Sequence, residues 1–303
     1  MVWPVIGGLA AAIAIAMAFF LFWRKQALPA FDSARAYSLL ERQCAFGPRV
    51  PGTEAHGQCR AFLVNELQQH ADRVSEQTFS HFVAALNREV TLTNIIAAFN
   101  LNAGKRALLC AHWDSRPWAD QDPDSSMHQT PVAGANDGAS GVAILLEVSR
   151  LLRLHPPDVG VDIILFDGED LGISGQSRSF ALGSQHFAQN KDKRYNPMFG
   201  LLLDMVGDRS LEIYQEANSW RYASGLTQEV WDKASDLGIS EFIPRVQHEV
   251  FDDHVPLIET GIPMVNLIDF DYPHWHTTED TPDKCSAESL DKVGRVVLAM
   301  VYR

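Results

Sequence analysis

Short apolar runs alternate along the chain with segments whose apolar residues recur at helical spacing. Residues 161–166 form a run of the first kind, whereas residues 138–154 place Val142, Leu145 and Val148 on one helical face. Strands that alternate with helices of this length predict an α/β fold, with a mostly parallel central sheet covered by helices on both faces. The strand-like runs are residues 90–99, 107–111, 161–166, 199–203 and 262–268, and the helical segments are residues 33–44, 138–154, 224–238 and 286–303.

An uncharged apolar segment, residues 2–23, stands apart from this pattern. As a helix it would extend roughly 33 Å, about the hydrocarbon thickness of a bilayer. It therefore predicts a transmembrane anchor over residues 1–26 that contacts the lipid bilayer, followed by a catalytic domain over residues 27–303. A cleavable signal peptide fits less well, because no positively charged stretch precedes the apolar run. Arg24 and Lys25, which follow it, favour a cytoplasmic position for the domain.

The charge balance narrows the class of partner. The chain has 38 acidic and 25 basic residues, for a formal net charge of −13. A nucleic-acid partner is not expected, because phosphates need a basic surface, and a neutral or cationic substrate fits better. Hydrophobic residues make up 46% of the chain, and no linker divides it after residue 30, so one large core is the simplest organisation.

The four cysteines show no metal-binding pattern, because no C-x-x-C pair occurs among them. In an oxidising compartment Cys44 and Cys59 can form a disulfide. Free buried thiols are at least equally expected.

Three short polar segments each end an apolar run or begin a helix: Gly134–Gly138, Phe166–Asp170 and Asp271–Thr278. In α/β folds ligands bind beyond the carboxyl ends of the strands, so these polar tips can converge. Taken singly, each acid could be a helix cap or turn residue and the histidine a surface residue. A catalytic zinc takes carboxylate oxygen and imidazole nitrogen from three residues and keeps a fourth position open. Asp137, Asp170 and His276 match that set and leave Glu169 free.

Residues Gly47 to Ala299 resemble the glutaminyl-peptide cyclotransferases, which share the fold of the zinc-dependent aminopeptidases. The resemblance rests on motifs that occur in the same order. The aspartate at the second zinc position, Asp170, resembles the residue found there in bacterial members, whereas animal members have glutamate. The motifs are His112-Trp113-Asp114-Ser115, Gly134-Ala135-Asn136-Asp137, Phe166-Asp167-Gly168-Glu169-Asp170, Leu182-Gly183-Ser184, Leu203-Asp204-Met205-Val206-Gly207, Asp252-Asp253-His254-Val255-Pro256 and Trp275-His276-Thr277.

The resemblance implies one zinc ion per chain, held by Asp137, Asp170 and His276, with Glu169 as the general acid and base. It implies peptides or proteins with amino-terminal glutamine as substrates, converted to pyroglutamate with release of ammonia. This substrate class suggests an extracytoplasmic catalytic domain, against the indication of the basic pair after the apolar run. The resemblance also implies a cis peptide bond between Asp137 and Gly138.

Further residues around the zinc follow from the same resemblance. Asp204 and Asp252 are expected to form a hydrogen-bonded carboxylate pair near Glu169. Trp275 is expected to flank the glutamine side chain of the substrate. The second pocket tryptophan of animal members has no match here, and Phe180 is expected to take its place.

The strongest rival is a two-zinc aminopeptidase of the same fold, in which Glu169 would activate water. His112 and Asp204 would then be additional ligands of a second metal. Asp252-Asp253-His254, and Trp275 directly before the histidine ligand, favour the cyclotransferase. A non-enzymatic adhesion or receptor domain is the remaining alternative, and the retention of Glu169 and of every zinc ligand argues against it.

Overall fold

The computed structural model describes residues 28–303. The predicted anchor at residues 2–23 lies outside this range, as does the proposed boundary at residue 26. Among the helices of residues 28–303, none is both long and apolar enough to cross a bilayer.

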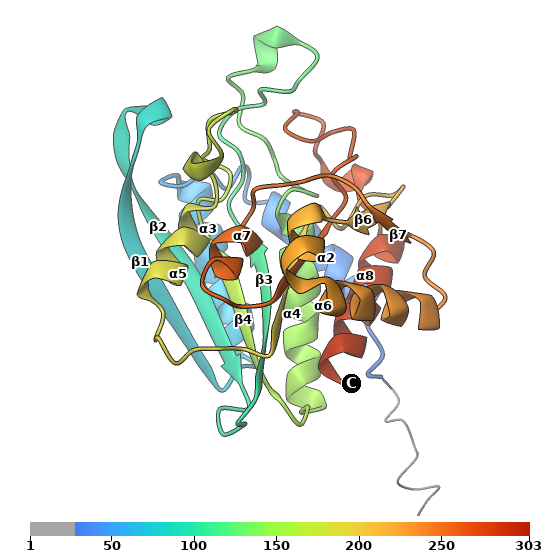
Figure 1. Cartoon of the computed structure of the whole chain (residues 1–303). Helices are drawn as coiled ribbons and strands as arrows, with labels where there is room; N and C mark the ends of the chain where they lie inside the picture. Colours follow the sequence, from blue (N-terminus) through green and yellow to red (C-terminus); the bar gives the residue numbers. More distant parts are fainter. Residues whose placement is uncertain (1–27) are drawn as a thin grey trace, which may run out of the picture.

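A six-stranded mixed sheet forms the centre of the fold (Figure 1). Its order is β1 (Arg73–Val83), β2 (Arg88–Phe99), β4 (Gly160–Phe166), β3 (Arg106–His112), β5 (Phe199–Asp204) and β8 (Met264–Ile268). The last four of these are mutually parallel, as predicted, whereas β1 and β2 run antiparallel at one edge. The prediction of a mostly parallel sheet is confirmed for these four strands, and the antiparallel edge makes the sheet mixed. A single 3₁₀ turn joins β1 to β2, and so short a connection can return the chain only in the antiparallel direction.

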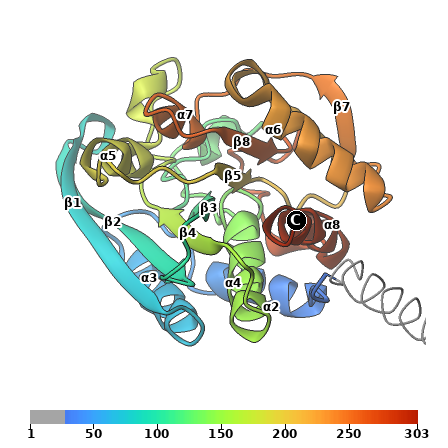
Figure 2. The ribbon, with the colours of Figure 1, turned by 60° about the horizontal axis from the view of Figure 1, so that its bottom comes forward.

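Helices cover both faces of the sheet (Figure 2). One face carries α2 (Ser33–Cys44), α3 (Glu54–Gln68), α4 (Ala139–Leu154) and α8 (Ala287–Val301), and the other carries α5 (Leu182–Asn190) and α7 (His254–Ile258). Leu109 packs into the core on the α4 side, whereas Leu108 and Cys110 pack with α5 and α7, as the alternation of a strand requires. The remaining elements are α6 (Ala217–Asp236), the small parallel pair β6 (Ile213–Gln215) and β7 (Phe242–Val246), and 3₁₀ turns at Ala84–Leu86, Ser125–Met127, Ser177–Ser179 and Pro282–Lys284.

Helix ends show where local signals decided the structure. Asp32 caps α2 by accepting a hydrogen bond from the backbone N–H of Arg35, as expected of an Asp at that position. Helix α6 begins at Ala217, before the predicted start at residue 224, because the Glu216 carboxylate caps its first turn. The backbone at Ala223 is non-helical (φ −142°, ψ 41°), so the periodic segment that begins at residue 224 is the second half of a kinked helix.

The parallel strands carry their carboxyl ends to one edge of the sheet. His112 ends β3, Asp204 ends β5, and the turn with Glu169 and Asp170 follows β4. The loop after β8 leads to His276 at the same edge. Residues far apart in the sequence are thereby brought together.

Candidate active site

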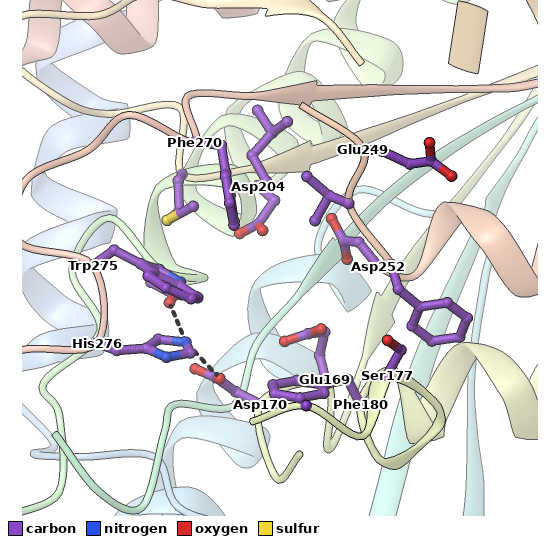
Figure 3. A pocket seen from close by; sticks show the side chains of 16 residues that line it. Glu169, Asp170, Ser177, Phe180, Asp204, Glu249, Asp252, Phe270, Trp275 and His276 are labelled. Atoms are coloured by element: carbon purple, nitrogen blue, oxygen red, sulfur yellow. Dashed lines mark ion pairs between the residues drawn. The ribbon is translucent and has the colours of Figure 1, made fainter. Parts of the chain in front are cut away.

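A cavity of about 190 Å³ opens at this edge (Figure 3). Figure 3 shows Trp275 beside His276, and Phe180 beside Glu169 and Asp170. His112, the alternative ligand, lies behind the cavity and is fully buried. The residues predicted for zinc, proton transfer and substrate all line the cavity: Asp137, Glu169, Asp170, Phe180, Asp204, Asp252, Trp275 and His276.

Asp137, Asp170 and His276 form what we call the outer cluster. Nε2 of His276 lies 3.1 Å from Oδ1 of Asp170 and 3.6 Å from Oδ2 of Asp137. Ligand atoms bound to one tetrahedral zinc at about 2.0–2.1 Å lie roughly 3.3 Å apart, so these separations suit a zinc ion. Oδ2 of Asp170 is buried and has no hydrogen-bond partner among the described residues, which leaves an oxygen free for a cation. The outer cluster therefore fits zinc.

His112, Asp137 and Asp204 form a second group, the inner cluster, which shares Asp137 with the first. Nε2 of His112 lies 3.0 Å from Oδ1 of Asp137 and 3.1 Å from Oδ1 of Asp204. Nδ1 of the same ring lies 3.5 Å from Oδ1 of Asp114. The residues of the inner cluster are also of the types that hold zinc, so the alternative ligand set is assembled as well.

Crowding and burial shift the pKa values of these groups. Burial and the charge of Asp170 raise the pKa of Asp137 to about 6. Burial lowers the pKa of His276, but the carboxylates of Asp170 and Asp120 outweigh this and raise it to about 9. The pKa of Glu169 is raised well above its ordinary value, by burial first and then by the charges of Asp170 and Asp252. These shifts follow from bringing several carboxylates together in a buried site.

A tight turn aims Glu169 into the cavity. Gly168 has φ +74°, in the left-handed region that favours glycine, and directs the chain away from β4. The Asp114 carboxylate accepts hydrogen bonds from the backbone N–H groups of both Glu169 and Asp170, each at 3.1 Å. The backbone of this acidic pair is therefore held in place while its side chains point in different directions.

Asp204 and Asp252 lie near each other but are not joined as predicted. Among the hydrogen bonds of the described residues, Asp204 accepts from His112, and Asp252 accepts from Nδ2 of Asn266 at 2.7 Å. The prediction of a direct hydrogen bond is wrong, because each carboxylate accepts a hydrogen bond from a residue of the central sheet instead. The two carboxylates still interact electrostatically. Burial, and then the charge of Asp204, raise the pKa of Asp252 to about 6.

The backbone around Asp137 also differs from the prediction. All described peptide bonds are trans, including the one between Asp137 and Gly138. Asp280 accepts hydrogen bonds from the N–H groups of Asn136 and Asp137, which holds the turn with a trans bond. A Cβ atom at Gly138 would lie 2.5 Å from the carbonyl oxygen of His112, so glycine is needed there for close packing.

Trp275 stacks on a predicted zinc ligand. Its ring centroid lies 3.8 Å from that of His276 and 5.2 Å from that of Phe270. Phe180 lies in contact with Gly172, where a side chain would collide with the phenyl ring. Both aromatic residues proposed for the substrate pocket thus reach the cavity from different loops.

Sequence reasoning missed two residues behind the outer cluster, Arg116 and Asp120. Arg116 is 1% exposed and forms ion pairs with Asp120 and with Asp170. A buried arginine cannot be recognised from sequence alone, because arginine is usually exposed.

The described cysteines, including Cys44 and Cys59, are all free thiols, and burial raises the pKa of Cys59 to about 12.

Comparisons with known proteins agree with this geometry. The model of Peptidase family M28 matches residues 94–301. Glutaminyl cyclase of Tannerella forsythia is 40% identical, with a TM-score of 0.87, and the match covers 91% of this chain and 99% of that one. A Zn-dependent exopeptidase from Parabacteroides distasonis is 38% identical, with a TM-score of 0.88, covering 91% of this chain and all of that one (100%). Glutaminyl-peptide cyclotransferase of Gloydius blomhoffii is 26% identical over 291 residues, covering 84% of this chain and 76% of that protein.

These matches confirm the resemblance that the motifs indicated. The family model spans the strands and loops that supply both clusters. The chain belongs to peptidase family M28.

Proposed function

We propose that the protein is a zinc-dependent glutaminyl-peptide cyclotransferase, which converts amino-terminal glutamine of peptides to pyroglutamate and releases ammonia. The observation that carries this proposal is the cavity in front of the outer cluster. It combines Glu169, which is not needed as a ligand, with Trp275 and Phe180 as apolar walls. An uncharged carboxamide side chain fits such a slot, and similarity to glutaminyl cyclases supports the assignment.

The reaction requires a group that takes up a proton and later returns it. The α-amine attacks the γ-carbonyl carbon of the glutamine side chain, a new C–N bond closes the ring, and the bond to the amide nitrogen breaks to release ammonia. Glu169 accepts the proton of the attacking amine and donates it to the departing nitrogen. A buried carboxylate whose pKa is raised above its ordinary value is better suited to both transfers than an exposed one.

Asp137, Asp170 and His276 would hold the zinc ion. When bound there, zinc supplies Lewis-acid polarisation of a carbonyl oxygen. Figure 3 shows Asp252 across the cavity from the ligand His276, and Asp204 also lines the cavity. Their carboxylates would stabilise the nitrogen that becomes positive as it leaves, and the charge of Asp204 contributes to the raised pKa of Asp252.

A two-zinc aminopeptidase remains the second candidate, because the inner cluster is assembled and shares Asp137 with the outer one. In that enzyme Glu169 would activate water for attack on the first peptide bond. The cyclotransferase needs one zinc ion, whereas the aminopeptidase needs both clusters filled.

An assay of the purified protein on two substrates separates the candidates. We expect ammonia and pyroglutamyl-alanine from Gln-Ala, no p-nitroaniline from Leu-p-nitroanilide, and one zinc ion per chain after gel filtration. Release of p-nitroaniline with two zinc ions per chain, one of them lost in Asp204→Ala, would instead establish the aminopeptidase.

We further propose that residues 2–23 anchor the enzyme in a membrane, on the evidence of their uncharged apolar sequence. Every residue of the proposed site lies in the described fold, so a protein lacking residues 1–26 should be soluble and active. If that protein aggregated without activity while the full-length protein in detergent turned over Gln-Ala, the proposed boundary would be wrong. The orientation of the protein in the membrane can be measured by testing whether a protease reaches the catalytic domain in intact vesicles.

A further inference from the structure

Arg116 is buried among the ligands of the outer cluster and uses its whole guanidinium group there. Nε and Nη2 donate to the two carboxylate oxygens of Asp120 at 2.6 and 2.7 Å. Nη1 donates to both the carbonyl oxygen and Oδ1 of Asp170, at 3.1 and 3.2 Å. One side chain thus contacts a proposed zinc ligand and a second carboxylate that is not a ligand.

Asp120 extends this contact to the histidine of the outer cluster. Its Oδ1 lies 3.4 Å from Nδ1 of His276, while Nε2 of the same ring faces Asp170 and Asp137. The backbone N–H of Gln121 also donates to the carbonyl oxygen of His276 at 3.1 Å. The partner of one imidazole nitrogen fixes the ring orientation and the tautomer in which the other nitrogen can bind a metal.

Burying the charges of Arg116, Asp120 and Asp170 costs desolvation free energy that ion pairing alone does not clearly recover. A buried ion pair gives little net stability, because desolvation offsets most of the attraction. Arg178 and Glu259 form a similar fork at the surface, where the Arg178 side chain is 62% exposed. An arginine can therefore form this fork at the surface without the cost of burial. Arg116 instead forms it inside the protein, where its charge and its planar donors contact Asp170.

We infer that Arg116 and Asp120 are positioning residues that hold Asp170 and His276 in the arrangement that binds zinc. This inference rests on the zinc site of the proposed function. Arg116 orients the Asp170 carboxylate, and its positive charge keeps Asp170 and Asp120 in place together. Asp120 orients the imidazole of His276. Lysine cannot replace Arg116 fully, because an ammonium group lacks the planar fork that spans two carboxylates.

Zinc affinity of the full-length protein in detergent, measured by competition with a chromophoric chelator, tests the inference. We expect Arg116→Lys and Asp120→Asn each to weaken zinc binding about 10- to 100-fold, the usual effect of losing a partner of a metal ligand. Arg178→Lys and Asp124→Asn are the matched controls. Arg178 forms its fork away from the clusters, and Asp124 lies in the same loop as Asp120 but bonds to Ser126. Both controls should bind zinc like the unaltered protein.

A merely structural role would give a different result. It would lower the stability of the zinc-free protein, seen as a lower thermal midpoint, while the folded fraction bound zinc with unaltered affinity. That result for both Arg116→Lys and Asp120→Asn would overturn the inference. If one variant failed to fold, as judged by circular dichroism, the zinc affinity of the other would decide.

Failure of the proposed function would look different again. If the unaltered protein itself bound no zinc, the proposed zinc enzyme would be wrong and this inference would fall with it. If the unaltered protein bound zinc and both variants bound it equally well, this inference alone would be wrong.

Discussion

The inner and outer clusters share Asp137 and are built from the same residue types, yet their surroundings differ. In the inner cluster His112 is fully buried, and its Nε2 donates to Asp204, so that carboxylate already has a partner. In the outer cluster Oδ2 of Asp170 is buried without a partner among the described residues. All three residues of the outer cluster line the cavity, whereas His112 of the inner cluster does not. Residue type alone therefore does not separate the two clusters. Their hydrogen-bond partners and their access to the cavity do.

The sharpest test of this comparison is removal of one histidine at a time. His276→Ala should abolish zinc binding and all measurable cyclisation, because it removes a ligand that no neighbour replaces. His112→Ala should retain one zinc ion per chain, because the outer cluster stays complete. Metal analysis after gel filtration and ammonia release from Gln-Ala measure both. Complete loss of zinc from His112→Ala would make the two clusters equivalent and contradict the comparison.

Glu169→Gln should separate proton transfer from metal binding. The variant keeps the shape of the side chain but cannot transfer a proton, so kcat should fall about 10²- to 10⁴-fold. Zinc content should not change, because Glu169 belongs to neither cluster. Near-normal kcat on Gln-Ala would show that another group carries the proton.

Trp275→Ala probes the cavity in front of the outer cluster. Loss of the wall stacked on His276 should raise KM and lower kcat/KM for Gln-Ala roughly 10-fold, since both binding and the geometry for ring closure suffer. Zinc content should stay at the value of the unaltered protein. Unchanged kinetics on both Gln-Ala and Gln-Phe would show that Trp275 has only a packing role.

The smallest effect on turnover is expected from Glu216, which supports the loop before Asp252 on the inner side. Burial raises its pKa, but hydrogen bonds from His254 and from the N–H groups of Asn218 and Ser219 outweigh this and lower it to about 2. The ordinary pKa of a glutamate is 4.5, so the folded state favours the charged form of Glu216. The resulting stabilisation, about 3 kcal/mol at pH 7, is present above the unfolded pKa and is lost as the pH falls towards the folded one.

Urea unfolding at pH 7 and pH 3 checks this expectation. The unaltered protein should be more stable than Glu216→Gln at pH 7, and roughly 2 kcal/mol of that difference should have disappeared at pH 3. Asp192→Asn, an exposed carboxylate paired with Arg194, is the control and should show little difference at either pH. A difference for Glu216→Gln that did not change with pH would exclude the charge as its source.

Helices and strands were predictable where burial imposed a period. Helix α4 begins and ends within a residue of its predicted bounds because it is apolar on most sides. Strand β1 was missed, since it lies at the sheet edge and most of its residues are exposed, which leaves no apolar run. Helix α3 was missed because its apolar residues are interrupted by polar ones, although Thr53 caps it.

The sequence by itself determined which residues end the parallel strands, and with them the chemical identity of the site. Apolar runs stop at His112, Asp204 and the Glu169-Asp170 pair, and the topology of an α/β sheet places such ends at one edge. Which partner each side chain takes depends on distances of a few ångström between loops that no local pattern encodes. The pairing of Asp204 with His112 rather than with Asp252, and the placement of Arg116 behind Asp170, were therefore decided only by the tertiary structure.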